Sequence, residues 1–305
     1  MNNKFAKLFL FVFALFLINN SFAKQMDKKE LELIQKKNFK VSLGENLIVK
    51  TDIGDVVVKS WYKNEVDIKI FGNKNAESKM EFSFNQDENS IEVIGEREGG
   101  KIFGWLNKID LKYEIMVPNK FNLNLKTSGG DLVSKIIEGN LDLKTSGGDI
   151  FIEDSKGKLN ASTSGGDIVL EKFNGNSDVA TSGGDIQIND ARGLVNAATS
   201  GGDIVIKSSE GEVNAETSGG DIFLDYSGKD QNINLRTSGG DIDINVPNSI
   251  NADADISTSG GSVYSNFSKS NNVKITKTKI VGKFNNGGKK LVCKTSGGDI
   301  KLTQK

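Results

Sequence analysis

The stretch LNASTSGGDIVLEKFNGN, residues 159–176, is one unit of a repeat that decides the fold of this chain. Its Thr-Ser-Gly-Gly core recurs along the chain, and the first six copies, from Thr127 to Thr217, follow one another at a constant interval. The last three copies are spaced more widely. A constant interval near 20 residues, with apolar positions inside each unit, is typical of a solenoid. The repeated threonines are Thr127, Thr145, Thr163, Thr181, Thr199, Thr217, Thr237, Thr258 and Thr295.

Each unit contains two short segments in which apolar and polar residues alternate. In this unit Leu159 and Ala161 have polar neighbours, and Ile168 and Leu170 flank Val169. Alternation with a period of two indicates strands, and the frequent glycines exclude a helix. We therefore predict an all-β fold, a single-stranded β-helix (β-solenoid) with coils of about 18 residues. Equivalent side chains of successive coils should then lie over one another.

The Thr-Ser-Gly-Gly-Asp segment is interpreted as a corner between the two strands. Two adjacent glycines can supply the positive φ angles of a sharp bend. The threonine lies last on the inward face of its strand, so its hydroxyl group can bond within the corner or to the same threonine one coil away. The aspartate carboxylate can accept backbone amides of the turn.

Residues 1–23 have the features of a signal peptide. Two lysines precede an uninterrupted apolar run at residues 8–18, and Ala23 follows Ser21 in a pattern that suits cleavage. This apolar run is too short to span a bilayer, which needs about 20 residues. The mature chain should therefore begin near Lys24, contain no transmembrane segment and be exported, acting in the periplasm, at the cell surface or outside the cell.

The spacing of the motifs divides the rest of the chain. The charged part, around residues 25–38, is expected to be a short helix or a leader without fixed structure. The wide gap between Thr258 and Thr295 is expected to hold an extra strand pair or a loop. The predicted organisation is a signal peptide at 1–23, a charged leader at 24–39, irregular β coils at 40–120 that continue into the solenoid, and the repeat solenoid at 121–305 with an insertion at 268–290.

The composition excludes several classes of function. The formal net charge is −1, so there is no basic field to attract nucleic acid. Histidine is absent, which removes the commonest general base and the commonest transition-metal ligand. Cys293 is the single cysteine, so no internal disulfide can form, and its inward position predicts a buried small hydrophobic residue.

Two longer segments carry a resemblance to a known family. LKYEIMVPNKFNLNLKTSGGDL (111–132) leads into the regular coils, and NVPNSINADADISTSGGSV (245–263) repeats its Val-Pro-Asn before another corner. Over residues 40–305 the chain resembles the bacterial toastrack domains, β-strand repeats known as "putative adhesins". The resemblance implies a β-helix exposed at the bacterial envelope, where some relatives are linked to envelope-stress signalling. It brings no catalytic residues to this chain.

An aspartate follows most of the glycine pairs, so stacking should place neighbouring carboxylates about 5 Å apart. Such a column either binds cations or uses its carboxylates in local hydrogen bonds. A calcium-stabilised β-roll is therefore an alternative interpretation, although the glycine-rich nonapeptide of such rolls is missing here. No other metal or cofactor is expected. The candidate metal ligands are Asp149, Asp167, Asp185, Asp203 and Asp221.

A carbohydrate-cleaving β-helix enzyme is a second alternative. Its site would need two carboxylates at a defined separation, or acids that bind a metal beside a basic residue. The repeat instead spreads its acids evenly, and no unit gathers them around an arginine or lysine. We therefore expect no catalytic residues and no enzymatic activity.

One outward position recurs after each corner. It is apolar at Phe151, Val169, Val205 and Phe223, and polar at Gln187 and Asp243. These four apolar side chains are a candidate docking stripe for a partner protein, a glycan or a second copy, although ordinary strand propensity also explains them. We expect an exported, non-catalytic envelope protein, adhesin-like or a recognition or structural scaffold, with an envelope protein or a glycan as partner and no nucleic acid.

Overall fold

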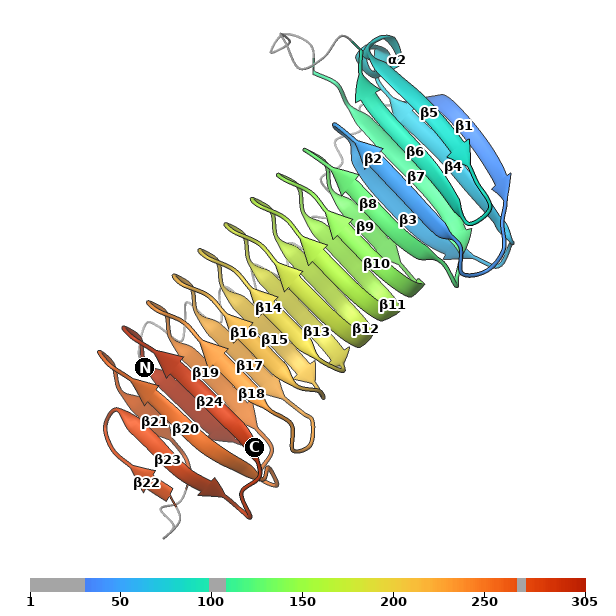
Figure 1. The fold of residues 1–305 in the computed structure, drawn as a ribbon. Helices are drawn as coiled ribbons and strands as arrows, with labels where there is room; N and C mark the ends of the chain where they lie inside the picture. Colours follow the sequence, from blue (N-terminus) through green and yellow to red (C-terminus); the bar gives the residue numbers. More distant parts are fainter. Residues whose placement is uncertain (1–30, 99–107, 268–272) are drawn as a thin grey trace. The chain divides into compact units, whose positions relative to one another are not determined.

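The computed structural model describes residues 31–98, 108–267 and 273–305, and this part of the chain is almost entirely β (Figure 1). The compact unit that carries the fold runs from Leu33 to Lys305. The predicted signal peptide at 1–23 lies outside the described residues, as do residues 24–30 of the predicted leader and residues 268–272 of the predicted insertion.

The repeat coils stack in parallel and in register, as predicted. Ile150 pairs with Ile168, and the same column continues through Ile186 to Ile204. These partners confirm an all-β solenoid whose coils have the predicted length. Its regular strands are β8 (Asn122–Thr127), β9 (Leu132–Lys135), β10 (Glu138–Lys144), β11 (Ile150–Ser162), β12 (Ile168–Ala180), β13 (Ile186–Arg192), β14 (Val195–Ala198), β15 (Ile204–Ser209), β16 (Val213–Glu216), β17 (Ile222–Tyr226), β18 (Ile233–Arg236) and β19 (Ile242–Val246).

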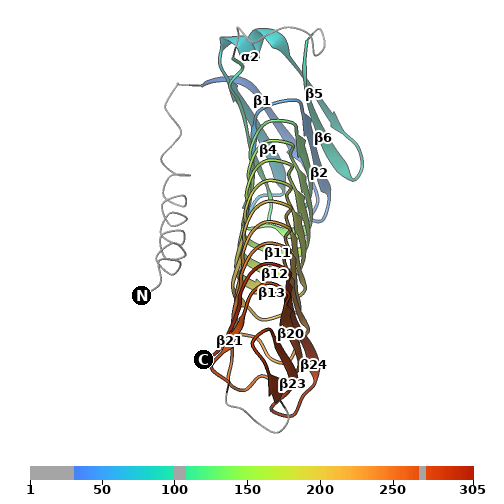
Figure 2. The same ribbon diagram turned by 90° about the vertical axis from the view of Figure 1, so that its left-hand side faces the viewer.

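Each coil contributes one segment to each of two sheets, which appear as the two legs of the arches in Figure 2. The pre-corner sheet holds the segments that lead into each Thr-Ser-Gly-Gly corner, and the post-corner sheet holds those that follow it. β11 and β12 run through the second corner of their coils and so belong to both sheets. In the repeat, the pre-corner sheet consists of β8, β10, the second halves of β11 and β12, β14, β16 and β18.

The core lies between the two sheets and is a column of aliphatic side chains. A large side chain at one core position is balanced by a small one at another position of the same coil. Phe173 fills the second corner of its coil, and the strand that follows carries Ser177. The coils on either side have Leu159 and Val195 at the position of Ser177. All four side chains are at most 2% exposed. Core volume is thus conserved per coil although single positions vary.

At the N-terminal end the stacking order departs from the chain order. β2 lies between β6 and β8, and β3 lies between β7 and β9. Antiparallel strands flank the outermost coil, with β4 against β7 and β5 against β6. The elements of this end are β2 (Asn46–Thr51), β3 (Asp55–Trp61), β4 (Glu65–Gly72), α2 (Lys74–Lys79), β5 (Met80–Gln86), β6 (Ser90–Arg97) and β7 (Leu111–Pro118).

The described part of the predicted leader is neither a helix nor without structure. β1 (Glu32–Lys40) is a strand that pairs with β4. Its sequence ELIQKKNFK places charged residues along the sheet edge, which discourages pairing with another chain. The charges that suggested a leader therefore belong to an edge strand.

The C-terminal end repeats the departure from chain order. β24 lies between β18 and β20, and β25 lies between β19 and β21. β23 pairs antiparallel with both β20 and β22, so the gap between Thr258 and Thr295 holds an extra strand pair. The strands here are β20 (Ala252–Thr258), β21 (Val263–Ser265), β22 (Val273–Ile275), β23 (Lys279–Phe284), β24 (Lys289–Thr295) and β25 (Ile300–Gln304).

Candidate functional site

The threonine of each regular corner joins its own coil to the preceding one. Thr163 Oγ1 donates to the carbonyl oxygen of Gly148 at 2.9 Å and accepts the N–H of Gly166 at 3.3 Å. The same pair of bonds recurs at Thr181 and Thr199. The hydroxyl group therefore bonds within the corner, which is one of the two predicted arrangements. Its bond to the neighbouring coil reaches a glycine carbonyl and not the equivalent threonine.

The reason for the paired glycines differs from the expected one, because neither residue of the pair has a positive φ in the regular coils. A Cβ atom on Gly184 would lie 2.0 Å from the carbonyl oxygen of Gly166, whereas one on Gly183 would lie 3.7 Å from its nearest neighbour. The second glycine is required because the backbones of adjacent coils touch. Positive φ occurs instead at the second corner, for example at Gly157 and Gly175.

The aspartates form one continuous column, and each engages the next coil. Asp149 Oδ1 accepts the N–H of Asp167 at 2.8 Å, and Asp185 Oδ1 accepts the N–H of Asp203 at 2.8 Å. Equivalent bonds of 2.7 to 3.0 Å extend the column from Asp55 to Ser262. The five candidate metal ligands, Asp149, Asp167, Asp185, Asp203 and Asp221, are thus brought together and act as backbone acceptors.

Burial raises the pKa of several carboxyl groups in this column. The backbone hydrogen bond from the next aspartate opposes that shift, and neighbouring carboxylates add to it. The carboxyls whose pKa is raised are those of Asp131, Asp149, Asp185 and Asp203. Among the described residues, no group of three or more acidic or cysteine side chains is arranged to hold a metal ion.

The predicted docking stripe is a true column of the post-corner sheet. Phe151 pairs with Val169, which pairs with Gln187, and Val205 pairs with both Gln187 and Phe223. Phe151, Val169 and Phe223 are partly exposed, whereas Val205 is only 7% exposed. Lys135 lies 4.9 Å above the Phe151 ring and pairs with Glu153 at 2.6 Å.

The column extends two coils further than the sequence analysis placed it. Val133 pairs with both Phe151 and Val57, and Val57 pairs with Glu114. Val57 and Val133 each stand two residues after a corner aspartate, so the same offset that located Phe151 would have found them. We call Val57, Val133, Phe151, Val169, Val205 and Phe223 the apolar stripe.

Ion pairs close the apolar stripe at both ends. Glu114 binds Lys112 at 2.7 Å beyond Val57, and Asp243 binds Lys301 at 3.5 Å beyond Phe223. Burial raises the pKa of Asp243, against the opposing effect of the Lys301 charge. An apolar centre with a charged rim is the usual anatomy of a protein interface.

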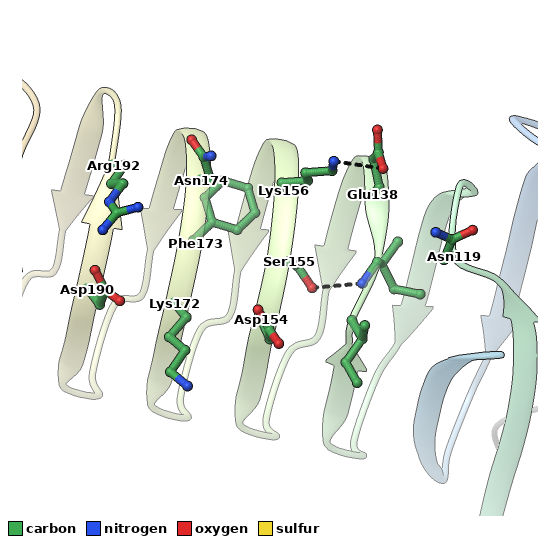
Figure 3. Close-up of a pocket in the computed structure, with 12 residues that line it drawn as sticks. Asn119, Glu138, Asp154, Ser155, Lys156, Lys172, Phe173, Asn174, Asp190 and Arg192 are labelled. Carbon is green, nitrogen blue, oxygen red and sulfur yellow. Dashed lines mark hydrogen bonds and ion pairs between the residues drawn. The ribbon is translucent and has the colours of Figure 1, made fainter. Parts of the chain in front are cut away.

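A groove of about 430 Å³ lies along the second corner, across successive coils (Figure 3). Lys156 forms an ion pair with Glu138 at 2.9 Å on one side of it. Asp154, Lys172 and Asp190 take the same position in three successive coils, so negative and positive charges alternate along the groove. Alternating charges cancel over a short distance, so neither sign of ligand is strongly attracted.

The same corner carries non-glycine residues in the left-handed region, where side chains are strained. They occur once per coil, at Ile136, Asp154, Lys172, Asp190 and Ser208, with φ between 49° and 60°. Ile136 is the exception in chemistry, because it is β-branched and 56% exposed where the other coils carry polar residues. These residues are evenly spaced in the sequence, but their side chains are of different types, so the sequence alone does not mark them as one set.

Cys293 is fully buried, as predicted. Burial raises the pKa of its thiol to about 12, so it stays protonated at neutral pH.

None of the helices in the described ranges has the length and apolar character needed to cross a membrane.

Comparison with solved structures gives distant likenesses. A "putative adhesin" from Bacteroides fragilis is 15% identical over 91% of this chain and 98% of its own, with a TM-score of 0.46. A "putative adhesin" from Parabacteroides merdae is 14% identical over 91% and 97%, with a TM-score of 0.35. A "putative lipid binding protein" from Parabacteroides distasonis is 12% identical over 89% and 96%, with a TM-score of 0.34.

No curated protein matches the chain. The family model for Toastrack DUF4097 matches residues 45–303, which include both antiparallel ends and every regular coil. The chain therefore belongs to the Toastrack DUF4097 family.

Proposed function

We propose that this protein is an exported, non-catalytic recognition scaffold of the bacterial envelope, with an adhesin-like role. The apolar stripe is the single observation that carries the proposal. Its members lie in register on one sheet face, and ion pairs bound them at both ends. A row of apolar side chains with a charged rim, interrupted by Gln187 between Val169 and Val205, suits docking of a protein partner.

The acidic groups of the repeat support a scaffold rather than a hydrolase. The carboxylates of the aspartate column accept backbone amides of the next coil, so their bonding serves the stack. In the groove at the second corner, Glu138 is paired with Lys156, and Lys172 separates Asp154 from Asp190, so the acids are spread along the stack and not set as a facing pair. The partner we favour is an envelope protein with a complementary apolar surface.

A capture experiment tests this proposal. The chain from Lys24 onward is used as bait with an envelope extract, beside the double variant Phe151→Ser/Phe223→Ser. A matched control, Ile48→Ser/Val292→Ser, makes the same kind of change at partly exposed positions of the pre-corner sheet. We expect one saturable partner to be retained by the wild type and the control and lost by the stripe variant. Equal capture by all three proteins would refute the role of the stripe.

A further inference from the structure

In the regular coils, the central outward column of the pre-corner sheet consists of asparagine and aspartate. In-register pairing runs through seven consecutive coils, with Asp142 next to Asn124 and Asn160, and Asn214 next to Asn196 and Asn234. We call this column the Asx ladder: Asn124, Asp142, Asn160, Asp178, Asn196, Asn214 and Asn234.

The fold does not require asparagine or aspartate at these positions. Asparagine and aspartate are depleted in strands, where β-branched residues are favoured. The same column carries Ile48 beside Asn124 and Val292 beside Asn234. The position therefore accepts ordinary strand residues, and seven polar residues in a row need another explanation.

A neighbouring asparagine column shows what a structural role looks like. Asn122 Oδ1 accepts the N–H of Asn140 at 2.9 Å, and Asn176 Oδ1 accepts the N–H of Leu194 at 3.3 Å. These side chains satisfy backbone amides of the next coil, as the corner aspartates do. Stabilisation of the stack is therefore a sufficient reason for asparagine at these positions.

The Asx ladder is not used in that way. Asn214 Nδ2 donates to Asn196 Oδ1 at 3.0 Å, and Asp142 forms an ion pair with Lys144 at 3.2 Å. The Oδ1 atoms of Asn124 and Asn234 have no hydrogen-bond partner in the described part of the chain. These two oxygen atoms are shielded from solvent, so a ligand would meet the exposed side chains of the column instead, such as Asn160 and Asp178.

The surface at the ladder is open to a ligand. A hollow of about 240 Å³ lies at its start, lined by Asn124, Asp142 and Asn160, with Lys158 beside them. In three middle coils the adjacent column towards the corner carries the small side chains Ser162, Ala180 and Ala198. The same column holds Lys144 on one side of them, and Glu216 and Arg236 on the other. The ladder therefore begins in a hollow and has a low border along its three middle coils.

We propose that the Asx ladder binds a neutral, extended, β-1,4-linked polysaccharide that lies across the coils with one sugar near each coil. An exposed amide such as that of Asn160 offers donors and an acceptor in one plane, which suits pairs of sugar hydroxyl groups. The coil spacing of about 4.8 Å repeats these groups regularly along the stack. Only two of the seven side chains are carboxylates, and they are not adjacent, so a row of cations fits the column less well.

Calorimetric titration of the chain from Lys24 onward with cellohexaose tests this proposal. We expect saturable binding by the wild type. The double variant Asn160→Val/Asn196→Val, which removes two amides and adds strand-favouring residues, should bind about tenfold or more weakly. Its melting temperature should be unchanged or higher, because the ladder makes few bonds within the protein.

Gln187→Val is the matched control, because it makes the same type of change on the post-corner sheet. It should leave cellohexaose binding unchanged, and so should Phe151→Ser/Phe223→Ser, which separates this proposal from the apolar stripe. Absence of binding by the wild type would overturn the proposal, as would equal binding by the ladder variant. A clear fall in the melting temperature of the ladder variant would overturn it as well, by showing that the column serves the fold.

Discussion

At the scale of single residues, contact between coils decides what each corner position tolerates. Gly183 and Gly184 are adjacent and chemically identical, yet only on the second would a Cβ atom overlap the backbone of the coil beside it. We expect Gly184→Ala to destabilise the protein by about 1–3 kcal/mol or more, because the added methyl group overlaps a carbonyl oxygen that cannot move freely. Gly183→Ala should be neutral or stabilising by up to about 1 kcal/mol. Urea unfolding of the two variants measures the difference, and equal stabilities would contradict close contact between coils.

The aspartate column makes stability depend on pH. Burial raises the pKa of Asp185, so the folded chain holds this proton at pH values where the unfolded chain has lost it. Stability therefore falls as pH rises through the window between the usual value of 3.8 and the raised folded value. At pH 7 the cost of the buried charge is fully present.

Two substitutions at this position separate charge from hydrogen bonding. Asp185→Asn keeps an oxygen acceptor for the Asp203 amide and removes the charge, so it should raise the melting temperature at pH 7. Asp185→Ala leaves that amide without its partner and should cost about 1 kcal/mol or more. The advantage of the asparagine variant should disappear below pH 3.8. An advantage that is the same at pH 3 and pH 7 would show that the charge is not the cause.

At the scale of strands, both ends of the solenoid are built out of chain order. β24 separates β18 from β20, although β20 comes first in the sequence. In a Cys293→Ala background, Asn234→Cys/Val292→Cys should form a disulfide on oxidation because the two residues are in-register neighbours. Asn234→Cys/Asp255→Cys should not, because the two strands lie about 9.6 Å apart, beyond the limit of about 7 Å between Cα atoms. Thiol titration after oxidation distinguishes the two, and the reverse result would mean that the strands stack in chain order.

The sequence could predict the coils but not this order. The constant interval of the repeat fixes which side chains share a column, and it correctly placed Phe151, Val169 and the corner aspartates. At the ends, however, Thr258 and Thr295 begin nearly the same corner, which ends in Ser262 in one case and Asp299 in the other. The spacing of the motifs therefore does not say which of them lies on Thr237. The choice depends on packing against β22 and β23, which no local pattern encodes. The role of the second glycine was missed for a similar reason, because it arises from an approach between coils and not from the φ angle of the residue.

At the scale of the whole solenoid, parallel stacking converts single positions into continuous columns with separate roles. The threonine and aspartate columns bond one coil to the next. The apolar stripe lies on the post-corner sheet and the Asx ladder on the pre-corner sheet, so a partner protein and a glycan could be held at the same time. Each proposed role depends on equivalent residues lying in a regular row.

Distances between spin labels on the exposed corner serines test that row most directly. With one label at Ser146→Cys, the second is placed in turn at Ser218→Cys, Ser296→Cys or Ser259→Cys, which lie four, six and seven coils away. At about 4.8 Å per coil, we predict separations of about 19, 29 and 34 Å, so that Ser259 is farther than Ser296 although it is nearer in sequence. A shorter distance to Ser259 than to Ser296, or distances that do not lengthen with each added coil, would contradict the stacked arrangement.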